Sequence, residues 1–409
     1  MAGDTHGLAG IINLMNRTLL FSLVSTGLCA AAPIQFDFGT NAQVEAFNHD
    51  KGSGFEIGAL PKQADGFITA DAPFLFSVVL PEGNYDVAVT LGDPHGVSDT
   101  CIKAESRRLM LENIVTSQGK QITKTFTVNV HRPDITGGGH VKLKDREKNY
   151  LHWDDKLTIE FNGSRPCVSR LEITPVADTT TIFLLGDSTV TDQAYEPWNS
   201  WGQMFTRFFK PGIAVANFAE SGESLRSSLG AFRVAKVLSM LKKGDYVFVQ
   251  FGHNDMKDKR EDALALYEKN LTELVKNIRA KGATPVLVTS MERKAGVTKN
   301  TLGDYPDTVK RVAAAEKTAL IDLHATSQTL YAGLGGNLNA AFQDGTHHNN
   351  FGSYEIAKCV VEGIRKEVPD LAKFIADDVK PFDPAKPDDP AAFKVPASPM
   401  KDPAKPDGN

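Results

Sequence analysis

Four short segments in the second half of the chain carry the residue types that acyl transfer requires. A serine becomes a nucleophile when a neighbouring base takes its proton, and an aspartate can hold a histidine in the orientation for that task. Backbone N–H groups and an asparagine amide can stabilise the oxyanion that forms on the substrate. The four segments are Gly186-Asp187-Ser188-Thr189, Ser221-Gly222-Glu223, Gly252-His253-Asn254-Asp255 and Asp344-Gly345-Thr346-His347.

The last segment supplies the acid–base pair. Asp344 and His347 stand three residues apart in a predicted loop, so the carboxylate can accept from one imidazole nitrogen while the other nitrogen faces Ser188. His348 is adjacent, but the spacing from Asp344 favours His347 as the base. The sequence therefore predicts Ser188, His347 and Asp344 as the catalytic residues.

Gly222 and Asn254 are the predicted oxyanion donors. Both follow predicted strands, as Ser188 does, and the carboxyl ends of parallel strands meet at one edge of a sheet. Without a Cβ, Gly222 lets its backbone N–H approach a substrate, whereas Asn254 can donate from its side chain. Taken singly, Ser188 could cap a helix, Gly222 could be a loop glycine and Asn254 a turn residue. The combination of the four segments favours chemistry over these simpler explanations.

A metal site is the competing use of the histidines. His253, His324, His347 and His348 could gather around a zinc ion, but no His-x-x-x-His or Cys-x-x-Cys pair supports it. We therefore expect no metal, and we expect His324 to have a packing or capping role.

The pattern of apolar residues divides the chain into two regions. Residues 33–177 contain short runs of β-branched and aromatic residues between turn residues, typical of an all-β sandwich or jelly roll. Over residues 180–370, apolar strands alternate with helical segments, which predicts a parallel α/β sheet covered on both faces. The predicted strands are 74–80, 84–90, 125–130 and 156–161 in the first region and 181–185, 213–217, 246–251, 285–289 and 319–323 in the second.

Length and composition agree with two soluble domains and a tail. The chain has 409 residues and a net charge of −5, which argues against a nucleic-acid-binding surface. No apolar stretch of membrane-spanning length follows the first thirty positions. The proline-rich tail, residues 380–409, predicts an extended wrap or disorder, and Phe382 and Phe393 favour partial docking.

The N-terminus, residues 1–32, has the features of a signal peptide. A short positive region precedes an apolar run from Leu19 to Leu28, and small residues follow it. The signal is best formed if translation begins at Met15; the alternative is a disordered N-terminal arm. It predicts a secreted or periplasmic protein with no membrane segment after cleavage. In such a compartment Cys101 and Cys167 could form a disulfide.

The four segments resemble those of the SGNH (GDSL-type) hydrolase superfamily. Together with Trp201-Gly202-Gln203 they look most like the rhamnogalacturonan acetylesterases within it. The resemblance covers residues 180 to about 370 and implies a three-layer α/β/α flavodoxin-like sheet. It also implies that the N–H of Ser188 completes the oxyanion hole, and that acetyl groups are removed from pectin backbones without a cofactor. One departure is Glu223, where the family often has arginine.

Residues 33–177 resemble the galactose-binding-like β-sandwich modules attached to some bacterial esterases of this kind. This similarity is looser, and no ligand residue follows from it.

The expected partner is an acetylated polysaccharide of the plant cell wall. Lys257 and Arg293 lie in loops on the predicted active-site face, where cations could hold galacturonate carboxylates. A solvated charged loop explains them equally well. The alternatives are an acetylxylan esterase, a lysophospholipase-like acyl hydrolase and, from another class, a carbohydrate-binding protein whose hydrolase domain is inactive.

Overall fold

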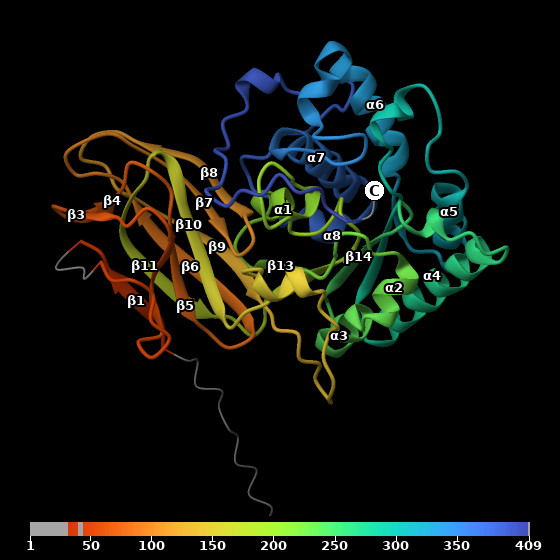
Figure 1. Ribbon diagram of the computed structural model, residues 1–409, viewed down its shortest axis with the longest axis horizontal. Coiled ribbons are helices and arrows are strands. Elements are labelled where there is room, and N and C mark those ends of the chain that lie inside the picture. The colour runs from red at the N-terminus through yellow and green to blue at the C-terminus, as the bar shows by residue number, and fades with distance from the viewer. Residues whose placement is uncertain (1–31, 40–43, 408–409) are drawn as a thin grey trace, which may run out of the picture. The chain divides into compact units, whose positions relative to one another are not determined.

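The computed structural model describes residues 32–39 and 44–407 (Figure 1). Residues 1–31 of the predicted signal peptide lie outside the described residues. No helix in the described part of the chain is long and apolar enough to cross a membrane.

Two antiparallel sheets form a β-sandwich in the first region. The first sheet contains β1 (Ile34–Asp37), β3 (Lys62–Ala64), β4 (Phe67–Thr69), β6 (Gly83–Leu91), β9 (Ile122–Val130) and β11 (Cys167–Pro175). The second contains β2 (Ser53–Gly58), β5 (Phe74–Val79), β7 (Ser98–Ala104), β8 (Arg108–Thr116) and β10 (Lys156–Arg165). The strand orders are β3-β4-β11-β6-β9, with β1 paired to β11, and β2-β5-β10-β7-β8. Alternate residues of β6, such as Val87 and Val89, are buried in the core of the sandwich, as the strand period of two requires.

A parallel sheet forms the second region. Its strands are β12 (Thr180–Gly186), β13 (Ile213–Asn217), β14 (Tyr246–Gln250), β15 (Thr284–Val288) and β16 (Ala319–Ile321), in the order β13-β12-β14-β15-β16. The α-helices are α1 (Trp201–Phe205), α2 (Leu225–Gly230), α3 (Arg233–Met240), α4 (Ala263–Ala280), α5 (Tyr305–Glu316), α6 (Leu323–Leu334), α7 (Asn350–Glu367) and α8 (Pro369–Ala372). The 3₁₀ helices are η1 (Asp145–Asn149), η2 (Thr206–Phe208), η3 (Asp255–Lys257), η4 (Lys294–Val297), η5 (Gly335–Ala341) and η6 (Pro390–Ala392).

Alternate side chains of β12 enter two different hydrophobic clusters. Ile182 and Leu184 pack in a cluster with residues of α1, α6 and α7, whereas Phe183 and Leu185 pack in one with residues of α3, α4 and α5. Helices therefore cover both faces of the parallel sheet (Figure 1). The three-layer α/β/α architecture and the preceding all-β sandwich are confirmed.

The predicted strands of the parallel sheet agree with the structure within two residues at each end. In the sandwich, the four predicted runs lie in β5, β6, β9 and β10, but the other strands were not identified individually. Buried charged residues hide the apolar pattern of two of them, since Lys103 lies in β7 and Arg108 in β8. The sequence pattern alone could not distinguish such strands from polar loops.

The turn before β8 packs against the segment that follows β12. Arg107 donates hydrogen bonds to the carbonyls of Gln193 and Trp198, at 3.0 and 2.8 Å. Arg108 pairs with Asp192 at 2.6 Å, and both side chains are fully buried. The sandwich thus supports the segment that follows the first parallel strand.

The Cys101–Cys167 disulfide considered from the sequence is not formed. Both residues are buried free thiols, and they belong to different sheets, β7 and β11. Cys359, in α7, is also a buried free thiol. The tail is an extended wrap in which Phe382 and Phe393 pack against the hydrophobic cluster around α7, so their predicted docking is confirmed.

Removing one partner of the Arg108–Asp192 pair should destabilise the fold. Arg108→Met leaves the Asp192 carboxylate buried with only a neutral partner, the Asn217 amide, and should cost about 3–5 kcal/mol of unfolding free energy. Adding Asp192→Leu should recover part of that loss. Urea denaturation measures both effects, with the exposed Arg170→Met as the matched control. A loss below about 1 kcal/mol would mean that the pair does not stabilise the fold.

Candidate active site

Ser188 lies in the tight turn that follows β12. The backbone N–H groups of Val190 and Thr191 both donate to the carbonyl of Asp187 at 3.0 Å, which reverses the chain directly after the strand. The turn lies at the carboxyl end of β12, whose neighbours in the sheet are β13 and β14. The loops after these two strands therefore lie close to Ser188.

Ser188, His347 and Asp344 form a continuous chain of hydrogen bonds. Nε2 of His347 lies 2.8 Å from Oγ of Ser188, and Nδ1 lies 2.9 Å from Oδ2 of Asp344. The other carboxylate oxygen accepts from the backbone N–H groups of Thr346 and His347, at 2.6 and 2.7 Å. Because a carboxylate only accepts, Nδ1 carries the proton and Nε2 is left to take the proton of the serine. This arrangement can activate the Ser188 hydroxyl.

The Asp344 carboxyl is held in its charged form. Partial burial by itself raises its pKa, but hydrogen bonds from His347 and from the backbone N–H of Thr346 outweigh burial and hold the pKa well below its ordinary value. The carboxylate therefore keeps its charge into the acidic range and continues to orient the imidazole.

His348 has no part in this chain of hydrogen bonds. Its Nε2 lies 3.0 Å from the Tyr331 hydroxyl, and its ring lies against that of Phe342, with centroids 4.2 Å apart. Burial, assisted by the neighbouring His347, lowers the pKa of His348 to about 3, so the ring is neutral at ordinary pH. The structure brings the three predicted catalytic residues together and leaves His348 in the core.

The predicted oxyanion donors lie in the loops after β13 and β14. Gly222 has a φ of +82°, a left-handed conformation that favours glycine. Neither the backbone N–H of Ser188 nor that of Gly222 donates to another described residue, so both can serve an incoming oxyanion. The Asn254 amide donates to the carbonyl of Glu223 at 3.0 Å, and its oxygen accepts from Lys257 at 3.0 Å. These two bonds fix the orientation of the amide.

A buried ion pair that the sequence reasoning missed joins the Ser188 turn to the Asn254 loop. Nδ1 of His253 lies 3.1 Å from Oδ2 of Asp187, and Nε2 lies 3.0 Å from the carbonyl of Met291. Both partners only accept hydrogen bonds, so each ring nitrogen of His253 faces an acceptor. Burial alone raises the pKa of Asp187, but the charge of His253 and its hydrogen bond outweigh burial and lower it. Both residues belong to the four segments, but their spacing in the sequence does not indicate that their side chains form a pair.

The histidines considered as zinc ligands have other partners. His324, for example, lies at the start of α6, and its Nε2 lies 3.2 Å from the carboxylate of Glu292. Within residues 32–39 and 44–407, no three His, Cys, Asp or Glu side chains form a group that could hold a metal ion.

Lys257 and Arg293, the predicted substrate-binding cations, lie near one another and bind groups of the protein itself. Arg293 donates to the carbonyls of His253 and Thr301 at 3.2 and 3.0 Å. Burial and then the charge of Arg293 lower the pKa of Lys257, which donates to the Asn254 side chain. Both cations hold the loops around Asn254 in place, and their contact with substrate stays a prediction.

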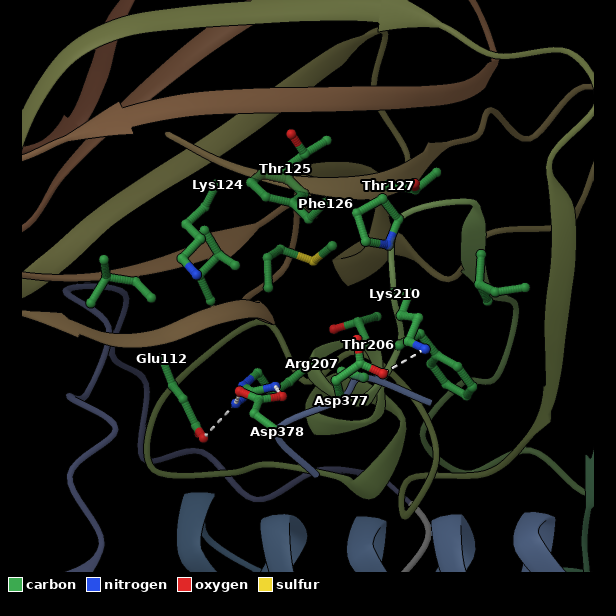
Figure 2. Close-up of a pocket in the computed structure, with 17 residues that line it drawn as sticks. Glu112, Lys124, Thr125, Phe126, Thr127, Thr206, Arg207, Lys210, Asp377 and Asp378 are labelled. Carbon is green, nitrogen blue, oxygen red and sulfur yellow. Dashed lines mark hydrogen bonds and ion pairs between the residues drawn. The ribbon is translucent and has the colours of Figure 1, made fainter. Parts of the chain in front are cut away.

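A cavity of about 400 Å³ lies away from these residues (Figure 2). Residues of β8 and β9 line one side, and residues 206–213 and 376–378 line the other. Its lining includes the ion pairs Arg207–Glu112, at 3.2 Å, and Lys210–Asp377, at 2.7 Å (Figure 2). None of the four chemistry-bearing segments contributes to the lining, so Ser188 would not meet a substrate there.

Comparison with known proteins gives matches to a hydrolase family and to esterases. Residues 184–353 match the GDSL-like lipase/acylhydrolase family. The chain is 35% identical over 207 residues to the rhamnogalacturonan acetylesterase RhgT of Bacillus subtilis (strain 168), a match that covers 45% of this chain and 89% of that protein. It is 26% identical over 369 residues to the uncharacterized esterase YxiM of the same strain, covering 81% of this chain and 91% of that protein. A crystal structure of the YXIM protein of Bacillus subtilis covers 82% of this chain and 98% of its own, with a TM-score of 0.46 and 23% identity.

The chain therefore belongs to the GDSL-like lipase/acylhydrolase family, the SGNH hydrolases. The resemblance found in the four segments is confirmed. The protein is an esterase.

Asp255 should make the stability of the protein depend on pH. Its Oδ1 accepts from the backbone N–H of Leu225 at 2.9 Å, its Oδ2 is buried, and burial chiefly raises its pKa to about 7. The unfolded chain releases this proton near its ordinary pKa of about 4, whereas the folded chain keeps it until about pH 7. Raising the pH through this window therefore favours unfolding, and the stability held by the bound proton is lost.

The Asp255→Asn variant should lose less stability than the wild type between about pH 4 and pH 7. Urea denaturation at several pH values measures the difference. Parallel stability curves for the two proteins would show that Asp255 does not keep its proton. Asp262→Asn, at the start of α4, is a control with the same change of charge.

Proposed function

We propose that the protein removes acetyl groups from an acetylated polysaccharide through an acyl-enzyme formed on Ser188. The observation that carries the proposal is the chain of hydrogen bonds from Asp344 through His347 to Oγ of Ser188, 2.9 and 2.8 Å long. Serine esterases need this order of acid, base and nucleophile. The matches to acetylesterases support the proposal independently.

In the first half of the reaction, His347 takes the proton of Ser188 as Oγ attacks the acetyl carbonyl carbon. The oxyanion that forms accepts from the backbone N–H groups of Ser188 and Gly222 and from the Asn254 amide. Asp344 stabilises the imidazolium. When the tetrahedral intermediate collapses, the C–O bond to the sugar breaks and the imidazolium protonates the departing sugar oxygen. The acetyl group stays on Ser188 as an ester.

In the second half, His347 takes a proton from water as the water oxygen attacks the acetyl-serine carbonyl. The same donors hold the second oxyanion. Collapse breaks the bond to Oγ, the imidazolium returns its proton to Ser188, and acetate leaves. The two halves need only these side chains and water.

A pectic polysaccharide, rhamnogalacturonan, is the substrate that we favour. RhgT is called a rhamnogalacturonan acetylesterase, and YesY of Bacillus subtilis, 33% identical over 202 residues, is called a probable one. The predicted signal peptide agrees, because a plant cell-wall polymer would meet the enzyme outside the cytoplasm in a secreted or periplasmic location. The other possibilities are acetylated xylan, a lysophospholipid or, for an inactive chain, glycan binding alone.

Loss of the nucleophile or of the base should abolish turnover. Ser188→Ala and His347→Ala should each lower kcat for 4-nitrophenyl acetate by about 10⁴-fold or more, because no other group replaces them. Asn254→Ala should cost about 10²–10³-fold through the loss of one oxyanion donor. His348→Gln, which keeps an N–H donor near the Tyr331 hydroxyl, is the matched control and should stay within about tenfold of the wild type. Full turnover by Ser188→Ala would exclude the mechanism.

Acetate release from purified polymers tests the substrate. We expect faster release from acetylated rhamnogalacturonan than from acetylated xylan, and none from either with Ser188→Ala. Faster release from xylan would reject the pectic assignment and keep the serine chemistry. A preference for long acyl chains in a series of 4-nitrophenyl esters would favour the lipid alternative, and no release from any ester would favour glycan binding.

A further inference from the structure

Arg146 reaches the active-site loops from the long connection between β9 and β10. Its Nη2 donates to the buried carboxylate of Glu220 at 2.5 Å and to the carbonyl of Ser221 at 3.0 Å. Lys144, from the same connection, donates to the carbonyl of Ser221 at 2.5 Å and lies 3.3 Å from Glu223. Two cations of the first region are thus fixed against the loop that carries Gly222.

The other terminal nitrogen of the Arg146 guanidinium binds a carboxylate of the tail. Its Nη2 is held by Glu220 and Ser221, whereas its Nη1 pairs with the carboxylate of Asp407 in the tail. A Cβ added to Gly222 would lie 3.1 Å from the Cβ of Asp407, so this tail residue packs against the oxyanion glycine itself. A carboxylate bound to Arg146 therefore sits beside the place where the substrate carbonyl must lie.

The tail passes between the two ends of the catalytic arrangement. Lys405 lies 3.5 Å from the carboxylate of Asp344, and Asp407 lies beside Gly222. The tail therefore contacts both the acid of the catalytic hydrogen-bond chain and the glycine predicted to hold the oxyanion.

The tail beyond residue 402 is held weakly. Glu196 fixes the preceding part through backbone hydrogen bonds with Met400 and Asp402, at 2.9 and 3.0 Å. Beyond Asp402, the residues are mostly exposed and are held by the ion pairs of Lys405 and Asp407. Exposed ion pairs contribute little stability, so a ligand with its own carboxylate can compete with them.

We propose that Arg146 is a substrate-binding residue for a carboxylate of the polymer, and that Asp407 occupies this subsite until a uronate replaces it. A guanidinium with one edge fixed by a buried carboxylate presents its other edge in a set orientation, which suits carboxylate recognition. The ligand class is an acetylated acidic polysaccharide, in which a carboxylate lies close to the acetylated sugar. The subsite rests on the proposed function, because it positions the ester against Ser188 and Gly222.

The test compares two polymers that differ only in charge, acetylated polygalacturonate and its methyl-esterified form, with the full chain. Arg146→Gln should raise KM for the charged polymer about tenfold and leave KM for the esterified polymer within about twofold. Arg146→Lys keeps the charge but not the paired N–H donors of the guanidinium, and it should give an intermediate KM. It also controls for a change of KM that comes from misfolding of Arg146→Gln. Lys148→Gln, in the same 3₁₀ helix but paired with Asp145 on the surface, is the matched control.

Asp407→Asn should have the opposite effect, because it removes the competing carboxylate. We expect KM for the charged polymer to fall about threefold, and no such change with Asp402→Asn, a control in the same tail. Equal changes of KM on both polymers in Arg146→Gln would overturn the carboxylate subsite. An unchanged KM in Asp407→Asn would overturn the role of the tail. Turnover of 4-nitrophenyl acetate by Ser188→Ala separates these failures, because it would instead overturn the proposed esterase mechanism.

Discussion

The buried pair of Asp187 and His253 holds together the loops on which the active site depends. It joins the turn after β12 to the loop after β14, with the Nδ1–Oδ2 distance at 3.1 Å. The Asp187 carboxylate also accepts from the backbone N–H and the hydroxyl of Thr189, at 2.9 and 2.7 Å, so its buried charge is compensated. Asp255 then joins the β14 loop to the start of α2 through the N–H of Leu225. Three separate strand ends are thereby held in one geometry, which oxyanion stabilisation requires because donors must be in place before charge develops.

The sequence could predict this edge of the sheet because the relevant signals are local. Each parallel strand is a short apolar run, and Ser188, Gly222 and Asn254 follow three of those runs within a few residues. The rule that parallel strands end at one edge then places residues far apart in the chain near one another. Asp344 and His347 share a single loop, so their contact needed no long-range information.

The parts that could not be predicted depend on contacts between distant segments. Arg107 lies just before β8 of the sandwich, and Arg108 is the first residue of that strand. Both are buried because the segment after β12 supplies acceptors for their guanidinium groups. Asp407 contacts Arg146, 261 positions away, and neither residue belongs to a periodic pattern. From the sequence, His253 was considered only as a possible zinc ligand, and its contact with Asp187 is a product of the fold. Residue type and spacing carry no information about which acceptors the fold brings to a charged side chain.

The cations around the active site show that the role of a cation depends on which acceptors it binds. The sequence placed Arg293 after a parallel strand, where substrate binding and a solvated charged loop were equal explanations. In the structure, Arg293 donates with both Nη1 and Nη2 to backbone carbonyls. Arg146 comes from the other region of the chain, but Glu220 and Ser221 hold only its Nη2 edge, and its Nη1 binds a carboxylate beside Gly222. A guanidinium whose two terminal nitrogens both bind carbonyls of the protein stabilises a loop, whereas one that the protein fixes along a single edge has the orientation and the remaining donors to bind an anion. The first region of the chain therefore contributes recognition chemistry at an active site whose catalytic groups all come from the second.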